Sequence, residues 1–291
     1  MAEVKGKSIR IAGKHICTVN VPSMIRMILL TALALFMILP LVYIISTSLK
    51  PLDELYLFPP KFITTRPTFS NFKDLFSALD GASVPFARYF FNSFMVSVLT
   101  VLGTVLVCCM GAYGLVKHRP KGAGHIFSLI LAALMFSGQV TLIPMFLMIN
   151  YISWTNTYRA LILPMVGAFG IFLMRQFMVS AIPDAILEAA RIDGANEYKI
   201  FWSISMPCVK PAWMTLIIFT FQSLWSATGG TYIYEESMRM LPNVLSQIAA
   251  GGIARTGAGS AVAVIIMIPP IIVFLISQSS VMETMAQSGI K

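Results

Sequence analysis

The chain has 291 residues, of which 57% are hydrophobic and only 11% are charged, and its formal net charge is +9. Soluble domains carry roughly 25% charged residues, so this composition excludes an ordinary soluble protein and predicts one integral membrane domain. We attribute the positive charge to lysines and arginines that flank membrane spans rather than to a surface for nucleic acid.

Apolar stretches along the chain predict six membrane spans, since a spanning helix needs about 20 mostly apolar residues. The predicted spans are residues 26–48, 89–116, 126–149, 160–182, 211–233 and 260–280. We expect the first to be retained, because its apolar stretch exceeds the roughly 7–15 residues of a signal-peptide core. Arg175 interrupts the fourth span near one end, from where its side chain can reach the headgroups.

The distribution of basic residues predicts how the spans are oriented. Six spans place both termini on one side, and that side carries 13 of the 21 lysines and arginines. This excess predicts that both termini are cytoplasmic. We therefore expect a cytoplasmic segment over 1–25, a membrane domain over 26–280 and a cytoplasmic tail over 281–291.

Two long loops are expected on the opposite side, at about 50–88 and 234–259. Prolines, aromatic residues and a Gly-rich stretch in these loops are compatible with a structured cap or docking surface. They are equally compatible with simple connectors.

The polar segment over 183–209, between the fourth and fifth spans, predicts two short helices joined by a bend. Asp184 can cap the first helix, Gly194 can end it in the left-handed conformation, and Asn196 can cap the second. We expect the second helix to stop near Met206, because the residue before Pro207 is disfavoured in helical geometry. On physical grounds alone, this hairpin could simply pack against its own bundle.

The spacing within this segment resembles the cytoplasmic "EAA" loop of ABC importer permease subunits. Glu188-Ala189-Ala190 is followed after three residues by Gly194, and nine residues later by Ile204-Ser205-Met206-Pro207. The family usually has Leu where this chain has Met206. Other stretches are similar to the carbohydrate-importing, maltose-type branch of the family. These are Asn92-Ser93, Ala112-Tyr113-Gly114-Leu115, Ile143-Pro144, Asn156-Thr157, Leu161-Ile162-Leu163-Pro164 and Ile192-Asp193-Gly194-Ala195.

Two regions depart from that branch. Trp225-Ser226 stands where the family often has Trp-Asn, and the stretch 228–240 is unusual. Detailed expectations for the outer half of a translocation path are therefore the least supported by the resemblance.

The resemblance implies an all-α integral membrane fold, namely a six-transmembrane-helix permease with both termini cytoplasmic, in a bacterial cell membrane. It implies that the loop couples to ATPase subunits. The residues assigned to this coupling are Glu188, Ala189, Ala190, Arg191, Asp193, Gly194, Ala195, Tyr198, Phe201 and Pro207.

The resemblance also implies a set of partners. They are a second homologous permease subunit, two ATPase subunits, an extracytoplasmic solute-binding protein and an oligosaccharide substrate. We expect no cofactor in this chain, which lacks the phosphate-loop pattern G-x-x-x-x-G-K-[ST], and we expect ATP and Mg²⁺ to be bound by the ATPase subunits. The chain is then a non-catalytic transport subunit.

Polar and aromatic residues within the spans are candidates for the sugar pathway, because sugars need hydrogen-bond partners and flat apolar faces. These candidates are Asn92, Gln139, Gln222, Trp225 and Ser226. For each of them, hydrogen bonding between helices is the simpler alternative.

Three other functions are compatible with a membrane domain of this size. An ABC permease for an amino acid, a metal or a peptide would share the loop but not the sugar-branch matches. A secondary transporter should show carboxylates within its spans for ion coupling, and the predicted spans hold no Asp or Glu. A membrane-embedded enzyme should show a grouping of catalytic side chains within the spans, and the sequence predicts none.

Overall fold

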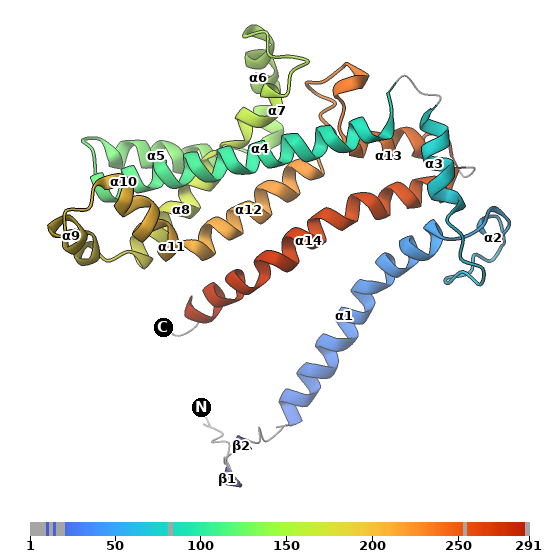
Figure 1. Cartoon of the computed structure of the whole chain (residues 1–291), viewed down its shortest axis with the longest axis horizontal. Coiled ribbons are helices and arrows are strands. Elements are labelled where there is room, and N and C mark those ends of the chain that lie inside the picture. The colour runs from blue at the N-terminus through green and yellow to red at the C-terminus, as the bar shows by residue number, and fades with distance from the viewer. Residues whose placement is uncertain (1–9, 12–13, 16–20, 81–83, 253–254, 289–291) are drawn as a thin grey trace.

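The computed structural model describes residues 10–11, 14–15, 21–80, 84–252 and 255–288, and these form an elongated bundle of helices (Figure 1). Its first part comprises strands β1 (Arg10–Ile11) and β2 (Lys14–His15), then α1 (Val21–Ser48), α2 (Leu52–Leu55), α3 (Ser70–Asp80), α4 (Phe86–Tyr113) and the π-helix η1 (Gly114–His118). Its middle part comprises α5 (Ala123–Leu134), α6 (Gly138–Tyr151), α7 (Arg159–Ile162), the 3₁₀ turn η2 (Leu163–Met165), α8 (Ala168–Ala181), α9 (Asp184–Ile192), α10 (Glu197–Ile200), the π-helix η3 (Phe201–Ser205) and α11 (Met206–Cys208). Its last part comprises α12 (Lys210–Trp225), the 3₁₀ turn η4 (Glu236–Met238), α13 (Leu241–Ala249) and α14 (Thr256–Ser288).

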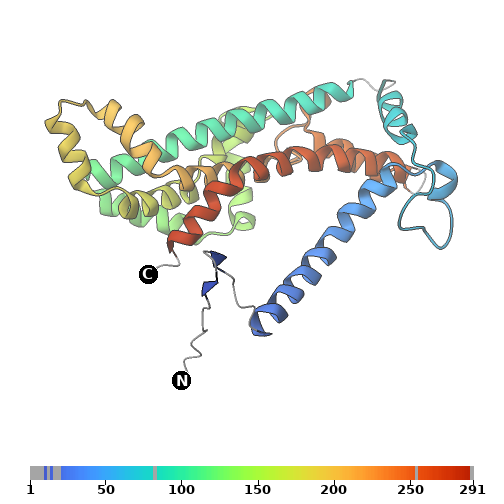
Figure 2. The ribbon, with the colours of Figure 1, turned by 60° about the horizontal axis from the view of Figure 1, so that its bottom comes forward.

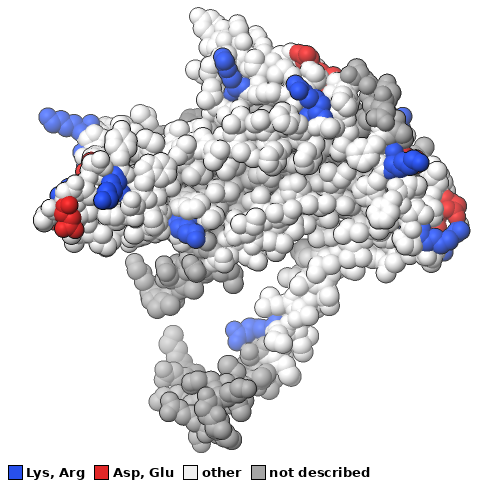
Figure 3. Space-filling view, viewed as in Figure 1, with Lys and Arg blue, Asp and Glu red and all other residues white. Residues whose placement is uncertain are grey.

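The predicted all-α class is confirmed, since the short antiparallel β1–β2 pair is the one departure within the described residues. We call the end of the bundle that carries α9–α11 the inner end, and the end that carries α2, α3 and α13 the outer end. In Figure 3 most charged side chains on the visible face gather toward these two ends, and largely uncharged surface lies between them.

Among the described residues, four helical segments are long and apolar enough to cross a bilayer: Met24–Ser48, Phe86–His118, Arg159–Ala181 and Thr256–Ser279. Two bent helix pairs raise the count to six if each is one span. The prediction of six spans corresponds to this upper count. The second span is the longest of the four, with 33 residues made of α4 and η1.

The third predicted span is broken, so the expectation of one continuous helix over 126–149 is wrong. α5 and α6 meet at an angle of 108°, and Ser137 between them has an extended backbone (ψ 149°). Gly138 has a low helix propensity and Ser137 is extended without a side-chain cap, so the helix is interrupted here although the apolar composition continues. α6 consequently projects from the side of the bundle (Figure 1).

The last two spans compare differently with the predictions. The fifth span was expected to reach residue 233, but α12 ends at Trp225, before a loop in which Gly229 has φ +69°. The sixth span, expected over 260–280, agrees at its end with the membrane-length segment Thr256–Ser279, although the helix α14, which includes Pro269 and Pro270, continues to Ser288. The expected tail over 281–291 is therefore helical as far as Ser288, and residues 289–291 lie outside the described part, as does most of the expected 1–25 segment.

Buried apolar side chains of the described residues form three clusters, of which the smallest includes Leu161, Leu224 and Met240. The inner cluster joins α4, α8, α9–α11 and α12, and includes Met174, Leu187 and Ile200. The outer cluster joins α3, α4, α12, α13 and α14, and includes Tyr89 and Trp225. Burying a leucine or isoleucine stabilises by about 1.5–3 kcal/mol relative to leaving it in water. The inner cluster therefore holds α9 and α10 firmly against the bundle.

A close approach of three helices at Gly170 gives a testable packing prediction. A Cβ atom on Gly170 of α8 would lie 2.5 Å from Cys108 Sγ and 3.3 Å from Leu216 Cδ1. We expect Gly170→Ala to destabilise the protein by about 1–3 kcal/mol, because this core has no room for a methyl group. Adding Cys108→Ala should restore part of the lost thermal stability. Gly103→Ala is the control, since a Cβ there meets nothing within 4 Å, and melting in detergent is the measurement.

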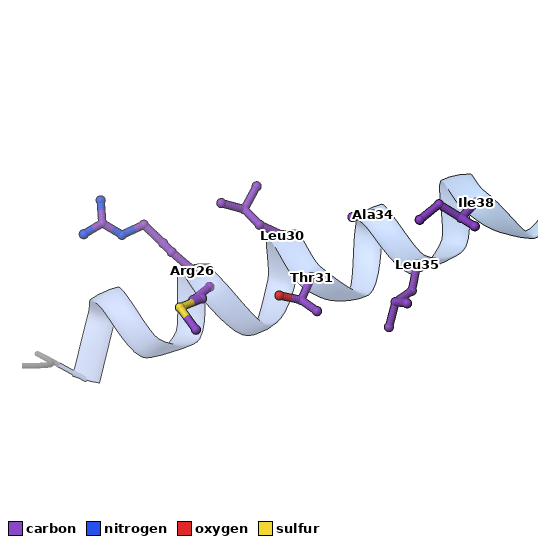
Figure 4. Close-up of a pocket in the computed structure, with 7 residues that line it drawn as sticks. Arg26, Leu30, Thr31, Ala34, Leu35 and Ile38 are labelled. Carbon is purple, nitrogen blue, oxygen red and sulfur yellow. The ribbon is translucent and has the colours of Figure 1, made fainter. Parts of the chain in front are cut away.

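α1 contacts α14 near its own C-terminal end, where Ser46 and Ser48 are buried, and leaves the bundle over the rest of its length. Figures 1 and 2 show α1 diverging from α14, and none of the 18-residue apolar window of α1 is buried. A depression of about 560 Å³ along α1 is lined only by residues of α1 itself, from Arg26 to Ile38 (Figure 4). This depression is therefore an uncovered helix face rather than an enclosed binding site.

Candidate functional site

The segment 184–208 forms a helical hairpin at the inner end of the bundle, which we call the EAA hairpin. α9 ends at a turn in which Gly194 has φ +79° and donates its N–H to the Arg191 carbonyl at 3.0 Å. Asn196 Oδ1 then accepts the Lys199 N–H at 2.8 Å and caps α10. The left-handed glycine and the Asn196 cap are both confirmed.

One local prediction for the hairpin is wrong, and a second is only approximate. Asp184 does not cap α9: the N-cap position is Pro183, and the Asp184 carboxylate bonds to side chains of another helix. The second arm ends at Cys208, two residues beyond the predicted stop near Met206, and Met206 itself is helical because the five-residue π-helix η3 passes directly into α11. Proline has no N–H to continue the backbone hydrogen bonds, and the helix ends one residue after Pro207. The chain then turns by 78° at Val209.

The EAA hairpin has one buried and one exposed face. Leu187 and Ala190 point into the inner cluster. The remaining coupling candidates of α9 and its turn are exposed: Glu188, Ala189, Arg191, Asp193 and Gly194. Two apolar or aromatic side chains also point outward, Ile192 at 86% exposure and Tyr198 at 76%. An exposed surface of this kind, rigidly backed by a core, is suited to contact with another protein.

The other coupling candidates lie along the second arm. Ala195 packs against the inner cluster, Phe201 is buried and Pro207 is exposed. Phe201 makes edge-to-face contacts with Tyr113 and Trp202. Together with Tyr198, these rings line a depression of about 320 Å³ between α4 and the hairpin.

An ionic contact joins α9 to the inner end of the second span. Lys117 Nζ donates to Asp184 Oδ1 at 2.7 Å and to the Ile182 carbonyl at 2.6 Å, and Arg119 donates to Asp184 Oδ2 at 3.2 Å. The Lys117 side chain is only 4% exposed. The hydrogen bond from Lys117 lowers the pKa of the Asp184 carboxyl. Asp184 is therefore ionised at neutral pH, and its contribution to stability is lost only as the pH falls through that lowered pKa.

A second contact joins the other arm to the same span. Glu197 accepts hydrogen bonds from Arg191 Nε at 2.9 Å and from the Tyr113 hydroxyl at 3.0 Å. The bond from Arg191, with that from Tyr113, lowers the pKa of Glu197. We call the two contacts together the inner clamp: Tyr113, Lys117, Arg119, Asp184, Arg191 and Glu197. Sequence reasoning treated Lys117 and Arg119 only as orientation signals and missed this role.

At the outer end, Asn92 is the centre of a buried hydrogen-bond network. Its Nδ2 donates to the Ser237 and Arg239 carbonyls at 2.9 and 3.0 Å, and its Oδ1 accepts the Tyr158 hydroxyl at 2.7 Å. Asn92 is 1% exposed. In this conformation its side chain binds the loop 226–240 to α4 and has no access to a solute.

Asn156 holds the same loop from the other side. It adopts φ +59°, and its Oδ1 accepts the Tyr234 and Glu235 N–H groups at 3.1 and 2.9 Å. Glu236 accepts the Tyr89 hydroxyl at 2.6 Å. Burial raises the pKa of Glu236, but hydrogen bonds from Tyr89 and Gln247 outweigh it, so the net pKa is lowered. We call these contacts, with those of Asn92, the outer network.

The remaining pathway candidates are dispersed. Trp225 is buried and donates its indole N–H to the Ile266 carbonyl at 2.8 Å. Gln139 is exposed at the start of α6, and Ser226 is exposed at the end of α12. Gln222 is exposed and lines a depression of about 250 Å³ between α12 and α14, beside Pro270. The structure does not gather the five into one site.

The structure is thus a bundle of membrane-length helices with a firmly packed helical hairpin at one end and a polar loop at the other, an architecture compatible with a membrane transport subunit. A family model described as "Binding-protein-dependent transport system inner membrane component" matches residues 103–285, more than half of the chain. The chain belongs to this family, and it is a multi-pass permease of the cell membrane.

Curated relatives agree with this assignment. The chain is 30% identical over 271 residues to the arabinooligosaccharides transport system permease protein AraQ of Bacillus subtilis (89% of this chain, 92% of AraQ). It is 30% identical over 257 residues to the probable ABC transporter permease protein YurM of the same species (87% and 83%). It is 33% identical over 202 residues to the sn-glycerol-3-phosphate transport system permease protein UgpE of Yersinia enterocolitica (67% and 71%).

Solved structures show the same fold. A chain of a bacterial ABC transporter that imports the acidic polysaccharide alginate superposes with a TM-score of 0.75 at 23% identity, covering 92% of this chain and 99% of that one. A chain of the alginate transporter in complex with its pentasaccharide-bound periplasmic protein gives a TM-score of 0.60 at 16% identity (89% and 94%). The chain is therefore an ABC importer permease in fold and in family.

Proposed function

We propose that this permease forms half of the translocation path for an oligosaccharide and receives ATP-driven motion through the exposed face of the EAA hairpin. ATP and Mg²⁺ are bound by separate ATPase subunits, and this chain performs no catalysis. The observation that carries the proposal is the outward presentation of Ile192 and Tyr198 on a hairpin whose opposite face is buried in the inner cluster. Both termini and the hairpin lie on the cytoplasmic side in this proposal.

The uncovered faces of the bundle support a second permease subunit as partner. α1 has no buried apolar window, and an apolar groove of about 520 Å³ lies between α4 and α14. Side chains of Phe94, Val101 and Ile272 line this groove. In the proposed complex these surfaces contact the second permease and lipid, and the outer network faces an extracytoplasmic solute-binding protein.

The oligosaccharide assignment is supported by the similarity to AraQ and by the sugar-branch matches. The pathway residues Gln139, Gln222 and Ser226 stay candidates, since all three are exposed in this single subunit. The relative UgpE favours glycerol phosphate as a second candidate substrate.

Purification of the intact complex tests the proposal. We expect ATPase subunits, a second permease and a solute-binding protein to co-purify with the full chain. ATP hydrolysis should rise when the binding protein is added with an oligosaccharide, and a panel that includes sn-glycerol 3-phosphate identifies the substrate class. Purification without any ATPase subunit would contradict the proposed function.

A further inference from the structure

The inner clamp not only stabilises the fold but also constrains the start of α9 at two points. Lys117 bonds at once to the Ile182 carbonyl, just before α9, and to the Asp184 carboxylate, the first residue of α9. One ammonium group therefore fixes both the position and the direction in which α9 leaves the bundle.

The backbone on either side of α9 is not helical, so the angle of α9 to the bundle depends on the side-chain contacts of α9 and not on a continuous helix. Ile182 and Pro183 have extended conformations before α9, and Gly194 ends it with φ +79°. Apolar packing through Leu187 and Ala190 holds α9 close to the bundle but is not directional. The hydrogen bonds of Lys117 and Arg119 are directional, so they set the orientation of α9.

The second half of the clamp acts on the same helix. Tyr113 lies four residues before Lys117 and holds Glu197 of α10, and Arg191 of α9 bonds to that same carboxylate. His118 Nε2 lies 3.7 Å from Glu197 as well. Both arms of the hairpin are thus tied to the inner end of the second span.

We propose that Lys117 and Asp184 are positioning residues for coupling: they fix the angle of α9 on the second span, so that motion imposed on the exposed face of α9 is passed to that span. This inference rests on the proposed function of the EAA hairpin. Water reaches the Asp184 side chain, which is 55% exposed, and screens the pair, but the Lys117 side chain is only 4% exposed. Removing the carboxylate therefore leaves a largely buried ammonium held by the Ile182 carbonyl alone.

Three variants in the intact complex separate positioning from simple stability. Asp184→Asn leaves the buried ammonium without its carboxylate, and should lower both thermal stability and the ratio of solute transported to ATP hydrolysed. Lys117→Met should lower that ratio as well. The double variant Lys117→Met/Asp184→Asn has no uncompensated buried charge, so its stability should recover while the ratio stays low by roughly fivefold or more. Lys121→Met, at an exposed lysine of the same loop, is the control and should match the wild type.

A double variant that recovers the wild-type ratio together with its stability would overturn the inference and reduce the clamp to a structural contact. Failure of all three variants to assemble, with Lys121→Met assembling normally, would overturn it in the same way. The proposed function is tested separately by the wild-type preparation: if no ATPase subunit accompanies it, the function itself is wrong, whatever the variants do.

Discussion

Replacing Gly194 by proline is expected to abolish coupled transport while the membrane bundle still inserts. Gly194 has φ +79°, and its N–H is the donor to the Arg191 carbonyl. Proline holds φ at about −65° and has no N–H, so a proline at this position costs about 3 kcal/mol or more and unfolds the turn between the arms. ATP hydrolysis and solute uptake by the reconstituted complex are the measurements, and we expect hydrolysis to persist without uptake or the ATPase subunits to be lost.

The matched control is Gly194→Asn at the same position. A Cβ added there meets nothing within 4 Å. Asparagine also tolerates the left-handed conformation better than most other residues with a side chain. The asparagine variant should therefore retain most of the transport. If the proline variant assembled and transported solute at the wild-type rate, the hairpin would not be the coupling element.

Replacing Asn92 by leucine is expected to release the outer loop 226–240 from α4. The change removes three part-buried hydrogen bonds, those from Asn92 to the Ser237 and Arg239 carbonyls and that from the Tyr158 hydroxyl. The Ser237 carbonyl still accepts from Arg88 Nε at 3.4 Å, so the Tyr158 hydroxyl and the Arg239 carbonyl lose the most and the loss should reach about 2–3 kcal/mol. We expect faster proteolysis within the loop and a weaker stimulation of ATP hydrolysis by the binding protein.

Tyr158→Phe provides the graded comparison, since it removes one of the three hydrogen bonds and should show about a third of the effect. The pair also separates two roles of Asn92. If Asn92 bound solute instead of the loop, Asn92→Leu would raise the solute concentration needed for half-maximal hydrolysis and leave the loop protected from protease.

Local signals were sufficient to predict much of the hairpin. The Gly194 bend and the Asn196 cap depend on residues within a few positions of each other, and the structure confirms both. The apolar spans were predicted for the same reason, because length and composition are local properties. The break at Ser137 was missed because apolar residues continue on both sides of it, and composition alone cannot show a change of direction.

The contacts that define the inner clamp and the outer network could not be predicted in this way. The partner of Asp184 is 67 positions away in the sequence, and the loop carbonyls bound by Asn92 are 145 and 147 positions away. From the local sequence, a carboxylate after a proline could be a helix cap or the partner of a distant residue. A polar residue in a span could likewise line a solute path or bond to a distant segment. Only the fold shows that the side chains of Asp184 and Asn92 are hydrogen-bonded to distant parts of the chain.

The length of the second span has a consequence for the lipid that surrounds this subunit. The span made of α4 and η1 has 33 residues. At a rise of about 1.5 Å per residue it extends roughly 50 Å, whereas the hydrocarbon slab is about 30 Å thick. The remaining length of about 20 Å extends into the two headgroup layers. Asn92 lies toward the outer end of the helix and Lys117 toward its inner end. Bilayers that differ by about 2–5 Å in thickness can therefore surround this helix without bringing the polar contacts of Asn92 or of Lys117 into the acyl chains.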